Sequence, residues 1–111
     1  MALDVLIQPQ VEIPRRGGDY ELILQLEDDG FTHFLAPFFE QLARTSGQRI
    51  DLYGDAAFGG ILLEDLKQTF AAARRTLEEK PQHEMKEKLD KMEAAIDRAK
   101  ATGSYITFWG D

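Results

Sequence analysis

The sequence predicts a single α+β domain, in which a small sheet of about four strands carries helices packed on one face and a C-terminal helical hairpin is followed by a last strand. Three patterns support this fold class. Residues 20–27 alternate apolar and polar side chains, residues 60–79 and 82–101 repeat apolar side chains every three or four positions, and residues 105–109 are β-branched and aromatic. A chain of 111 residues has a common size for one domain with one core.

The first part of the chain predicts two strands. Residues 2–7 form a strand candidate that ends before Pro9. Residues 10–19 contain one proline and two adjacent glycines, which favour a connection, one that can begin with another extended piece. Residues 20–27 then predict a strand with one mostly buried face. The side chains on that face would be Tyr20, Leu22, Leu24 and Leu26.

Residues 31–46 have the period of a helix, and Gly47 supplies its stop. Asp28 or Asp29 would cap the first turn. Pro37 complicates this prediction, because a proline inside a helix costs ~3 kcal/mol. The segment is either a kinked helix or a turn over its first five residues followed by a helix that starts with Pro37, and the second version is favoured.

The rest of the chain predicts a strand, two helices and a strand. Residues 49–53 return to extended character. Residues 60–79 and 82–101 predict amphipathic helices, and the short connection between them favours an antiparallel hairpin. A homodimer formed through this hairpin is one alternative, because the second helix is heptad-like. Residues 105–109 predict the last strand.

Two short sequences match each other, "IDLYGD" at residues 50–55 and "ITFWGD" at residues 106–111. If strands 49–53 and 105–109 are parallel neighbours, both endings lie at one edge of the sheet, where ligands of α/β sheets tend to bind. One interpretation is therefore a small-ligand or divalent-cation site at this edge, in a binding protein or an enzyme. Its residues would be Tyr53, Asp55, Trp109 and Asp111, with Asp51 as a further oxygen ligand for a cation.

The other interpretation of this stretch is structural. Gly54 and Gly110 would allow positive φ where the strands end, and Asp55 would cap a turn or a helix N-terminus. Gly59 and Gly60 would let the loop pass tightly against the sheet. The stretch lacks the Lys and Ser/Thr of a phosphate-binding loop and the glycine spacing of a dinucleotide turn, so no cofactor is expected.

Composition excludes several kinds of chemistry. The chain has no cysteine, which excludes disulfides, thiolate nucleophiles and thiolate metal sites. Its net charge of −7 argues against nucleic acid and anionic membranes as partners. No apolar run has the length of a signal peptide or a membrane span, so a cytoplasmic protein is expected.

The candidate catalytic residues form no recognisable constellation. His33 and His83 are the only histidines, and neither has a nucleophile placed beside it by sequence. Ser46 and Ser104 occupy positions where serine has ordinary turn roles. The expectation is therefore a protein that is not an enzyme.

The acidic surplus lies in the first half of the chain. Residues 1–58 contain ten acidic and four basic residues, whereas residues 59–111 contain ten and nine. This asymmetry serves solubility, or it steers a basic protein partner toward an acidic face. Four phenylalanines within residues 31–39 suggest that one ring lies off the core, and Phe39 is the expected one. The candidate partner-binding residues are Glu27, Asp28, Asp29, Phe39, Asp51 and Asp55.

Several stretches together suggest a resemblance: "MALDV", "ELILQLEDDGFTHFLAPFFEQL", "IDLYGDAAFGG" and an ending of the type G-x-x-I-x-F-x-G-D. With these features the chain resembles small, acidic, functionally uncharacterised bacterial proteins. It is loosely similar in kind to toxin-immunity proteins, which neutralise a toxin by binding it. That similarity implies a protein partner with a basic surface, and it carries no motif from which a binding residue could be transferred.

Overall fold

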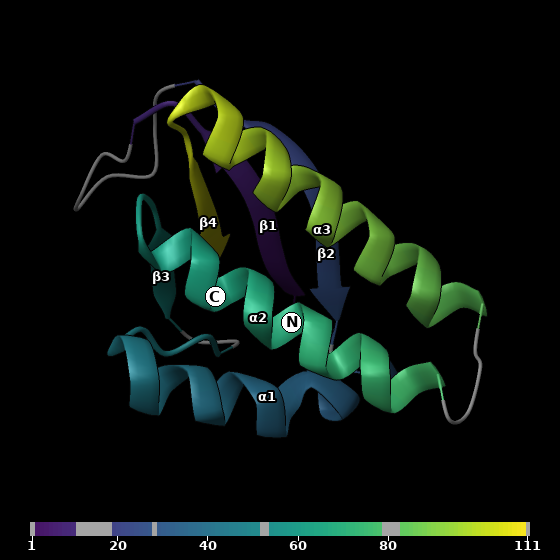
Figure 1. The fold of residues 1–111 in the computed structure, drawn as a ribbon. Coiled ribbons are helices and arrows are strands. Elements are labelled where there is room, and N and C mark those ends of the chain that lie inside the picture. Colours follow the sequence, from purple (N-terminus) through teal and green to yellow (C-terminus); the bar gives the residue numbers. More distant parts are fainter. Residues whose placement is uncertain (1, 11–18, 28, 52–53, 79–82, 111) are drawn as a thin grey trace.

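The computed structural model describes residues 2–10, 19–27, 29–51, 54–78 and 83–110. These residues form four strands and three helices (Figure 1). In chain order the elements are β1 (Ala2–Gln8), β2 (Glu21–Glu27), α1 (Gly30–Ser46), β3 (Asp55–Phe58), α2 (Leu62–Glu78), α3 (His83–Thr102) and β4 (Tyr105–Trp109). Within the described ranges, no helix has both the length and the apolar character that a membrane span requires.

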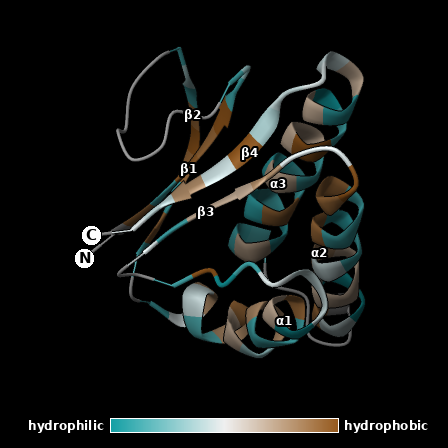
Figure 2. Ribbon diagram, turned by 90° about the vertical axis from the view of Figure 1, so that its left-hand side faces the viewer, coloured by the Kyte–Doolittle hydropathy of each residue, from teal (hydrophilic) through white to brown (hydrophobic). Residues whose placement is uncertain are grey.

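The strands form one antiparallel sheet in the order β2-β1-β4-β3. The first and last strands of the chain are therefore the two central ones. Helices α2 and α3 form an antiparallel hairpin across the sheet (Figure 1), and Figure 2 shows that the helices lie on one side of it. The α+β fold class is confirmed, including the four strands, the helices on one face and the last strand after the C-terminal hairpin.

The core lies between the helices and one face of the sheet. Leu3, Val5 and Ile7 of β1 point into it at every second position, as successive strand residues face opposite sides. Ile106 and Phe108 of β4 do the same. The helices contribute the apolar side chains that repeat about every 3.6 residues, and the strands contribute those that repeat every two residues. Both sets pack against each other in this core.

Phe39 lies at the aromatic centre of this core. Its ring centroid is 6.0 Å from that of Phe70 and 6.3 Å from that of Phe108, both in edge-on geometry. The side chain is only 6% exposed, so the expectation that this ring lies off the core is wrong. The helical period explains the difference, because Phe39 falls on the same stripe as the buried Phe31 and Leu35.

Helix α1 is continuous through Pro37, so the favoured version with a turn before Pro37 is wrong. Phe31 and Leu35 before the proline and Leu42 after it are all buried, and one uninterrupted helix places them on one face. Of the two predicted N-cap candidates, Asp29 is the N-cap of α1, since its side chain accepts hydrogen bonds from the backbone N–H groups of Phe31 and Thr32. Packing and capping together offset the ~3 kcal/mol that an interior proline costs.

The third strand is not where the sequence pattern predicted it. Residues 49–51 are not in a strand, residues 52–53 lie outside the described part, and β3 comprises residues 55–58. This strand pairs antiparallel to β4, so the expected parallel pairing is also wrong. The buried side chains of Ala56 and Phe58 explain the shift, because they alternate toward the core from a stretch that looked like a glycine-rich loop.

The glycines of this region have different roles from the predicted ones. Among the described glycines, positive φ angles occur at Gly47, Gly60 and Gly103. The expectation of positive φ at Gly54 and Gly110 is therefore wrong. Gly59 does allow a close approach, because a Cβ at this position would lie 2.2 Å from the ring of Tyr105.

Candidate functional site: the open face of the sheet

The sheet has a second face that none of the described helices covers (Figure 2). Leu3, Val5 and Ile7 face the core, so the alternate residues of β1 face the other way. Cross-strand partners in the pairing register share a side of the sheet, which extends this assignment to the other strands. We call these side chains the open sheet face: Asp4, Leu6, Gln8, Leu22, Gln25, Glu27, Asp55, Ala57, Tyr105, Thr107 and Trp109.

An irregularity in the pairing of β1 with β2 decides which residues of β2 belong to this face. Val5 pairs with Leu24 and Leu6 pairs with Leu22, so Ile23 is an extra residue between them. The extra residue reverses the alternation, and Leu22 lies on the open face with 49% of its surface exposed. The predicted burial of Leu22 together with Leu24 and Leu26 on one face is therefore wrong.

Aromatic side chains gather on the open face. Tyr20, which directly precedes β2, contacts Trp109 of β4 with ring centroids 5.1 Å apart and an interplanar angle of 66°. Tyr20 is 54% exposed, and its predicted place on a buried face is wrong as well. Tyr105, which is also exposed, lies against Gly59. The contact between Tyr20 and Trp109 connects the start of β2 with β4. In the middle of the same face, Leu6, Gln8 and Thr107 are only 1–3% exposed.

The charged side chains of the open face are all acidic. They are Asp4, Glu27 and Asp55, and the four described strands contain no lysine or arginine. Trp109 pairs with Asp4 on one side and with Asp55 on the other, so the three residues form one row across the sheet. The row ends on β2 with Gln25, whose Nε2 donates a hydrogen bond of 2.7 Å to Asp4 Oδ1.

The two matching aromatic-Gly-Asp sequences do meet, although in antiparallel strands. The backbone N–H of Gly110 donates to the carbonyl oxygen of Gly54 at 3.0 Å and to Asp55 Oδ1 at 3.2 Å. The Asp55 carboxylate therefore accepts a hydrogen bond from the residue that follows β4 and stabilises the end of that strand. It does not cap a helix. Asp111 and Tyr53, the other members of the predicted ligand site, lie outside the described residues.

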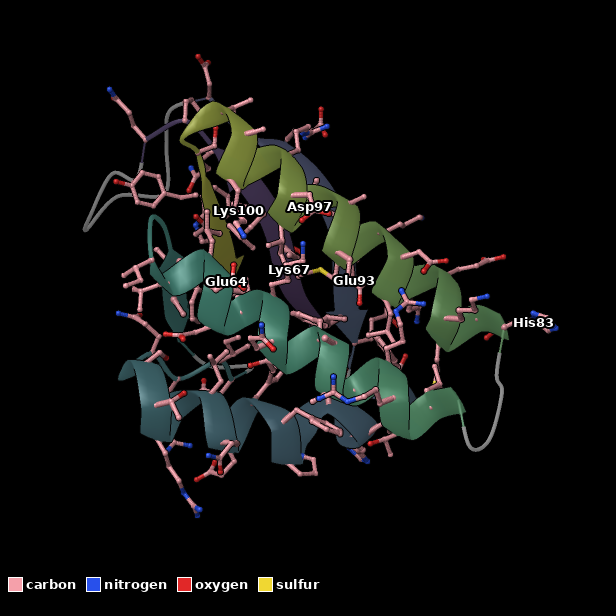
Figure 3. All side chains as sticks on the ribbon, in the orientation of Figure 1. Glu64, Lys67, His83, Glu93, Asp97 and Lys100 are labelled. Carbon is pink, nitrogen blue, oxygen red and sulfur yellow. The ribbon has the colours of Figure 1, made fainter. Side chains whose placement is uncertain are left out.

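Lysines and arginines are concentrated in the helical layer. Of those in the described ranges, all but Arg49 lie in helices. Lys67 of α2 pairs with Asp97 of α3 at 2.6 Å, and Lys100 pairs with Glu64 (Figure 3). The hydrogen bond from Lys100 lowers the pKa of Glu64, with a smaller contribution from the side chain of Gln68.

A further pair crosses the same helical hairpin. Arg74 of α2 contacts Glu93 at 3.0 Å and also pairs with Asp90, and hydrogen bonds to these two carboxylates raise its pKa. Arg98 of α3 pairs with Glu21 of β2, which faces the helices. Glu64, Asp90, Glu93 and Asp97 of the hairpin therefore have basic partners within the chain.

The other predicted acidic candidates are spread over the molecule. Asp29 is occupied as the N-cap of α1, and its Oδ2 lies 4.0 Å from Lys88 Nζ. Asp51 borders a pocket of about 280 Å³ beside α1, together with the ion pair between Glu40 and Arg49. Asp28 lies outside the described residues. Only Glu27 and Asp55 of the predicted set belong to the open face.

The residues considered for catalysis are not brought together. His33 is exposed on α1, and His83 lies at the start of α3, at the far end of the hairpin (Figure 3). The Ser46 hydroxyl donates to the carbonyl oxygen of Leu42, and the Ser104 hydroxyl contacts that of Thr102. In the described ranges, no group of three His, Cys, Asp or Glu side chains is arranged to hold a metal ion.

Among the charged and exposed apolar side chains of the open sheet face, sequence reasoning missed Asp4, Leu22 and Tyr105, and it also missed the adjoining Tyr20. Asp4 could have been found from the alternation of residues 2–7, because it stands between the apolar Leu3 and Val5. The positions of Tyr20 and Leu22 depend on the bulge in β2, and no local sequence pattern marks this bulge.

Comparisons with protein-family models, curated proteins and solved structures found no match for this chain.

Proposed function

We propose that the protein is a non-enzymatic interaction module that binds a basic protein partner through the open sheet face. The observation that carries this proposal is the composition of that face, where exposed aromatic and aliphatic side chains lie among carboxylates and the described strands contribute no basic residue. An immunity-type inhibitor of a basic toxin is one protein of this kind.

Apolar exposure supports a docking role for this face. Tyr20, Leu22 and Tyr105 are three of the four large apolar side chains that stand out as exposed among the described residues. Exposed apolar side chains that gather on one surface and are rimmed by polar groups are typical of protein-binding sites. Aromatic residues supply much of the binding energy at such interfaces, because they bury a large area with few rotatable bonds.

The negative charges of the open sheet face would favour partners with a basic surface. Asp4, Glu27 and Asp55 give this face a negative potential, and a partner with lysines and arginines would meet it with complementary charge. Surface charges of this kind accelerate the encounter and reject acidic competitors. Their effect falls with added salt, because the Debye length is about 10 Å at 0.1 M ionic strength.

Site-specific photo-crosslinking in cells of the source organism tests this proposal. A photoreactive amino acid replaces Leu22 on the open face, and in a matched variant it replaces Arg75, which is exposed on α2. We expect the Leu22 variant to capture one dominant protein with a basic surface, and the yield in lysate to fall as salt is raised from 50 to about 300 mM. The Arg75 variant should not capture it.

A second comparison addresses the charges. Asp4→Asn with Asp55→Asn should reduce the crosslinking yield at Leu22. Glu84→Gln with Glu87→Gln removes two exposed carboxylates from α3 and should leave the yield unchanged. Equal capture from both crosslinker positions, an acidic partner, or equal effects of the two double variants would contradict the proposal.

A further inference from the structure

We infer that the partner binds along the outer edge of β2 as an additional strand, through an extended segment that carries lysine or arginine side chains. This inference rests on the function proposed above, and it specifies how the partner is held. It follows from the place of β2 at one edge of the sheet, beside the open sheet face, and from the acidic residues at both ends of this strand.

The outer edge of β2 has backbone groups that an added strand can pair with. Among the described elements β2 has one strand neighbour, because it stands first in the order β2-β1-β4-β3 (Figure 1). Every second residue of an edge strand directs its backbone N–H and C=O groups away from the sheet. In the described ranges, the one backbone atom of β2 bonded outside the strand pairing is the carbonyl oxygen of Glu27, which accepts from the Asp29 N–H and the Thr32 hydroxyl. The edge before Glu27 is therefore suited to strand addition.

The two edges of the sheet differ in length and in protection. β3, at the other edge, has four residues, whereas β2 has seven. Natural edge strands are commonly protected by being short or by carrying lysine or proline, and β2 has none of these features. Its protection consists of two glutamates and the bulge at Ile23. Carboxylates repel acidic chains and attract basic ones, so this edge discriminates between partners.

Apolar side chains on both sides of β2 offer contacts to an added strand. Leu22 is exposed on the open sheet face. Ile23 and Leu24 pack against the core but are only half-buried, so part of each side chain is still accessible. Successive side chains of a neighbouring strand face opposite sides of the sheet. One set would therefore cover Leu22, and the other would cover Ile23 or Leu24.

The charges at the ends of β2 favour a basic segment. Asp19 before the strand and Glu27 at its end are both exposed, and in the described ranges neither carboxylate has a basic partner. Glu21, by contrast, pairs with Arg98 of α3. A lysine or arginine opposite Asp19 or Glu27 would add a cross-strand pair of opposite charges, which stabilises strand pairing.

The same charges disfavour a second copy of this chain at the edge. Two β2 strands placed side by side would bring four glutamates together, since each strand carries two glutamates and no basic residue. Like charges on neighbouring strands are destabilising. The net charge of −7 on each chain adds to this repulsion.

Peptides with and without backbone N–H groups test strand addition directly. Capped Lys-Val-Lys-Val-Lys is titrated into the full chain at low salt, while the backbone amide NMR signals and their hydrogen exchange are recorded. We expect the signals of residues 21–27 to shift and amide exchange in β2 to slow. The same peptide N-methylated at its three central residues keeps the charge, and it should bind at least about tenfold more weakly, the factor for roughly two lost hydrogen bonds.

Two single variants test the role of charge. Glu27→Gln should weaken binding of the unmethylated peptide about two- to fivefold, the range for one exposed pair of opposite charges. Glu84→Gln removes an exposed carboxylate from α3 and should leave the affinity unchanged. An unfolded variant is recognised by the loss of NMR dispersion, and Asp19→Asn then replaces Glu27→Gln.

The outcomes separate this inference from the proposed function. Equal binding of the two peptides, with signals changing on the open sheet face, overturns strand addition and leaves the proposed function standing. Signal changes confined to β3, or no binding of either peptide, overturn this inference alone, because crosslinking from Leu22 tests the proposed function independently. Signal changes confined to the helices overturn both.

Two further outcomes identify other occupants of this edge. Concentration-dependent signals of residues 21–27 without peptide would show that a second copy of the chain covers the edge, which overturns the inference. The chain's own Arg15 and Arg16 lie outside the described residues, and Arg15→Gln with Arg16→Gln tests them. If that variant alone allows the peptide to bind, the occupant is the chain itself and the inference fails.

Discussion

Carboxylates of the open sheet face and of the α2–α3 hairpin have different kinds of partners in the described part of the chain. On the hairpin, Glu64, Glu93 and Asp97 each pair with a lysine or arginine of the neighbouring helix (Figure 3). On the open face, Asp4 and Asp55 accept hydrogen bonds from an amide side chain and a backbone N–H. The described strands contribute no lysine or arginine to the open sheet face, whereas the hairpin places basic side chains next to these acidic ones.

The largest expected change in the free energy of unfolding comes from comparing substitutions on the two sides of β4. Phe108→Ala should lower the free energy of unfolding by about 3–5 kcal/mol, because it removes a fully buried ring that packs edge-on against Phe58 at 5.7 Å. Tyr105→Ala, on the open side of the same strand, should cost about 1 kcal/mol or less, because the ring is already partly exposed. Urea denaturation measures both. Equal losses would show that the open face is a second core rather than a docking surface.

A smaller change in stability is expected when Asp29, a carboxylate with a structural role, is substituted. Asp29→Ala should destabilise the protein by about 1 kcal/mol, since it removes the N-cap of α1. Asp29→Asn keeps an oxygen acceptor and should lose much less, which isolates the cap from the distant charge of Lys88. Thermal and urea unfolding of the two variants provide the measurement. A loss of the same size in both would assign the effect to charge instead of capping.

The ion pairs of the hairpin should make a pH-dependent contribution to the free energy of unfolding. We expect this contribution to be smaller than that of the Asp29 cap. The Lys100 hydrogen bond lowers the pKa of Glu64 below its ordinary 4.5, so the folded state holds the carboxylate form more strongly than the unfolded state does. This contribution is complete above the unfolded-state pKa and is lost as the pH falls through the lower, folded-state value. Glu64→Gln should therefore reduce stability near neutral pH and flatten its decline below about pH 4.5. Parallel pH profiles of the two proteins would reject this assignment.

The smallest effect on stability is expected on the open face itself. Asp4→Asn with Asp55→Asn should change the free energy of unfolding by no more than about 0.5 kcal/mol, because both sites are surface positions and asparagine retains the accepting oxygens. The same variant should lose affinity for a basic partner, which makes stability and binding separable. A large drop in stability would show that these carboxylates hold the sheet together and would weaken the comparison with the hairpin.

Local patterns were sufficient for most elements of the fold. The helices at residues 60–79 and 82–101 occur at Leu62–Glu78 and His83–Thr102, because long amphipathic repeats leave few alternatives. The strands predicted at 2–7 and 105–109 are also confirmed. The third strand was missed, since four residues between glycines carry too little alternation to outweigh the signal of a loop.

The candidate site was only partly predictable. Asp55 and Trp109 were identified from the matching sequence endings, and they are neighbours in the register although the strands run antiparallel. Asp4 joined them only through the pairing of β1 with β4, which connects residues more than 100 positions apart in the chain. Tyr20 and Leu22 reached the open face through a bulge whose cause lies in the pairing of two strands.

By itself, the sequence determined the α+β class, the helical hairpin, a cap at Asp28 or Asp29 and the acidic character of the first half, because each depends on residues close together in the chain. The tertiary structure alone decided the strand order, the burial of Phe39 and the row of Asp4, Trp109 and Asp55. Periodicity can say that a strand has two faces, whereas the pairing register decides which side chains share a face and which carboxylates therefore lie next to the same indole.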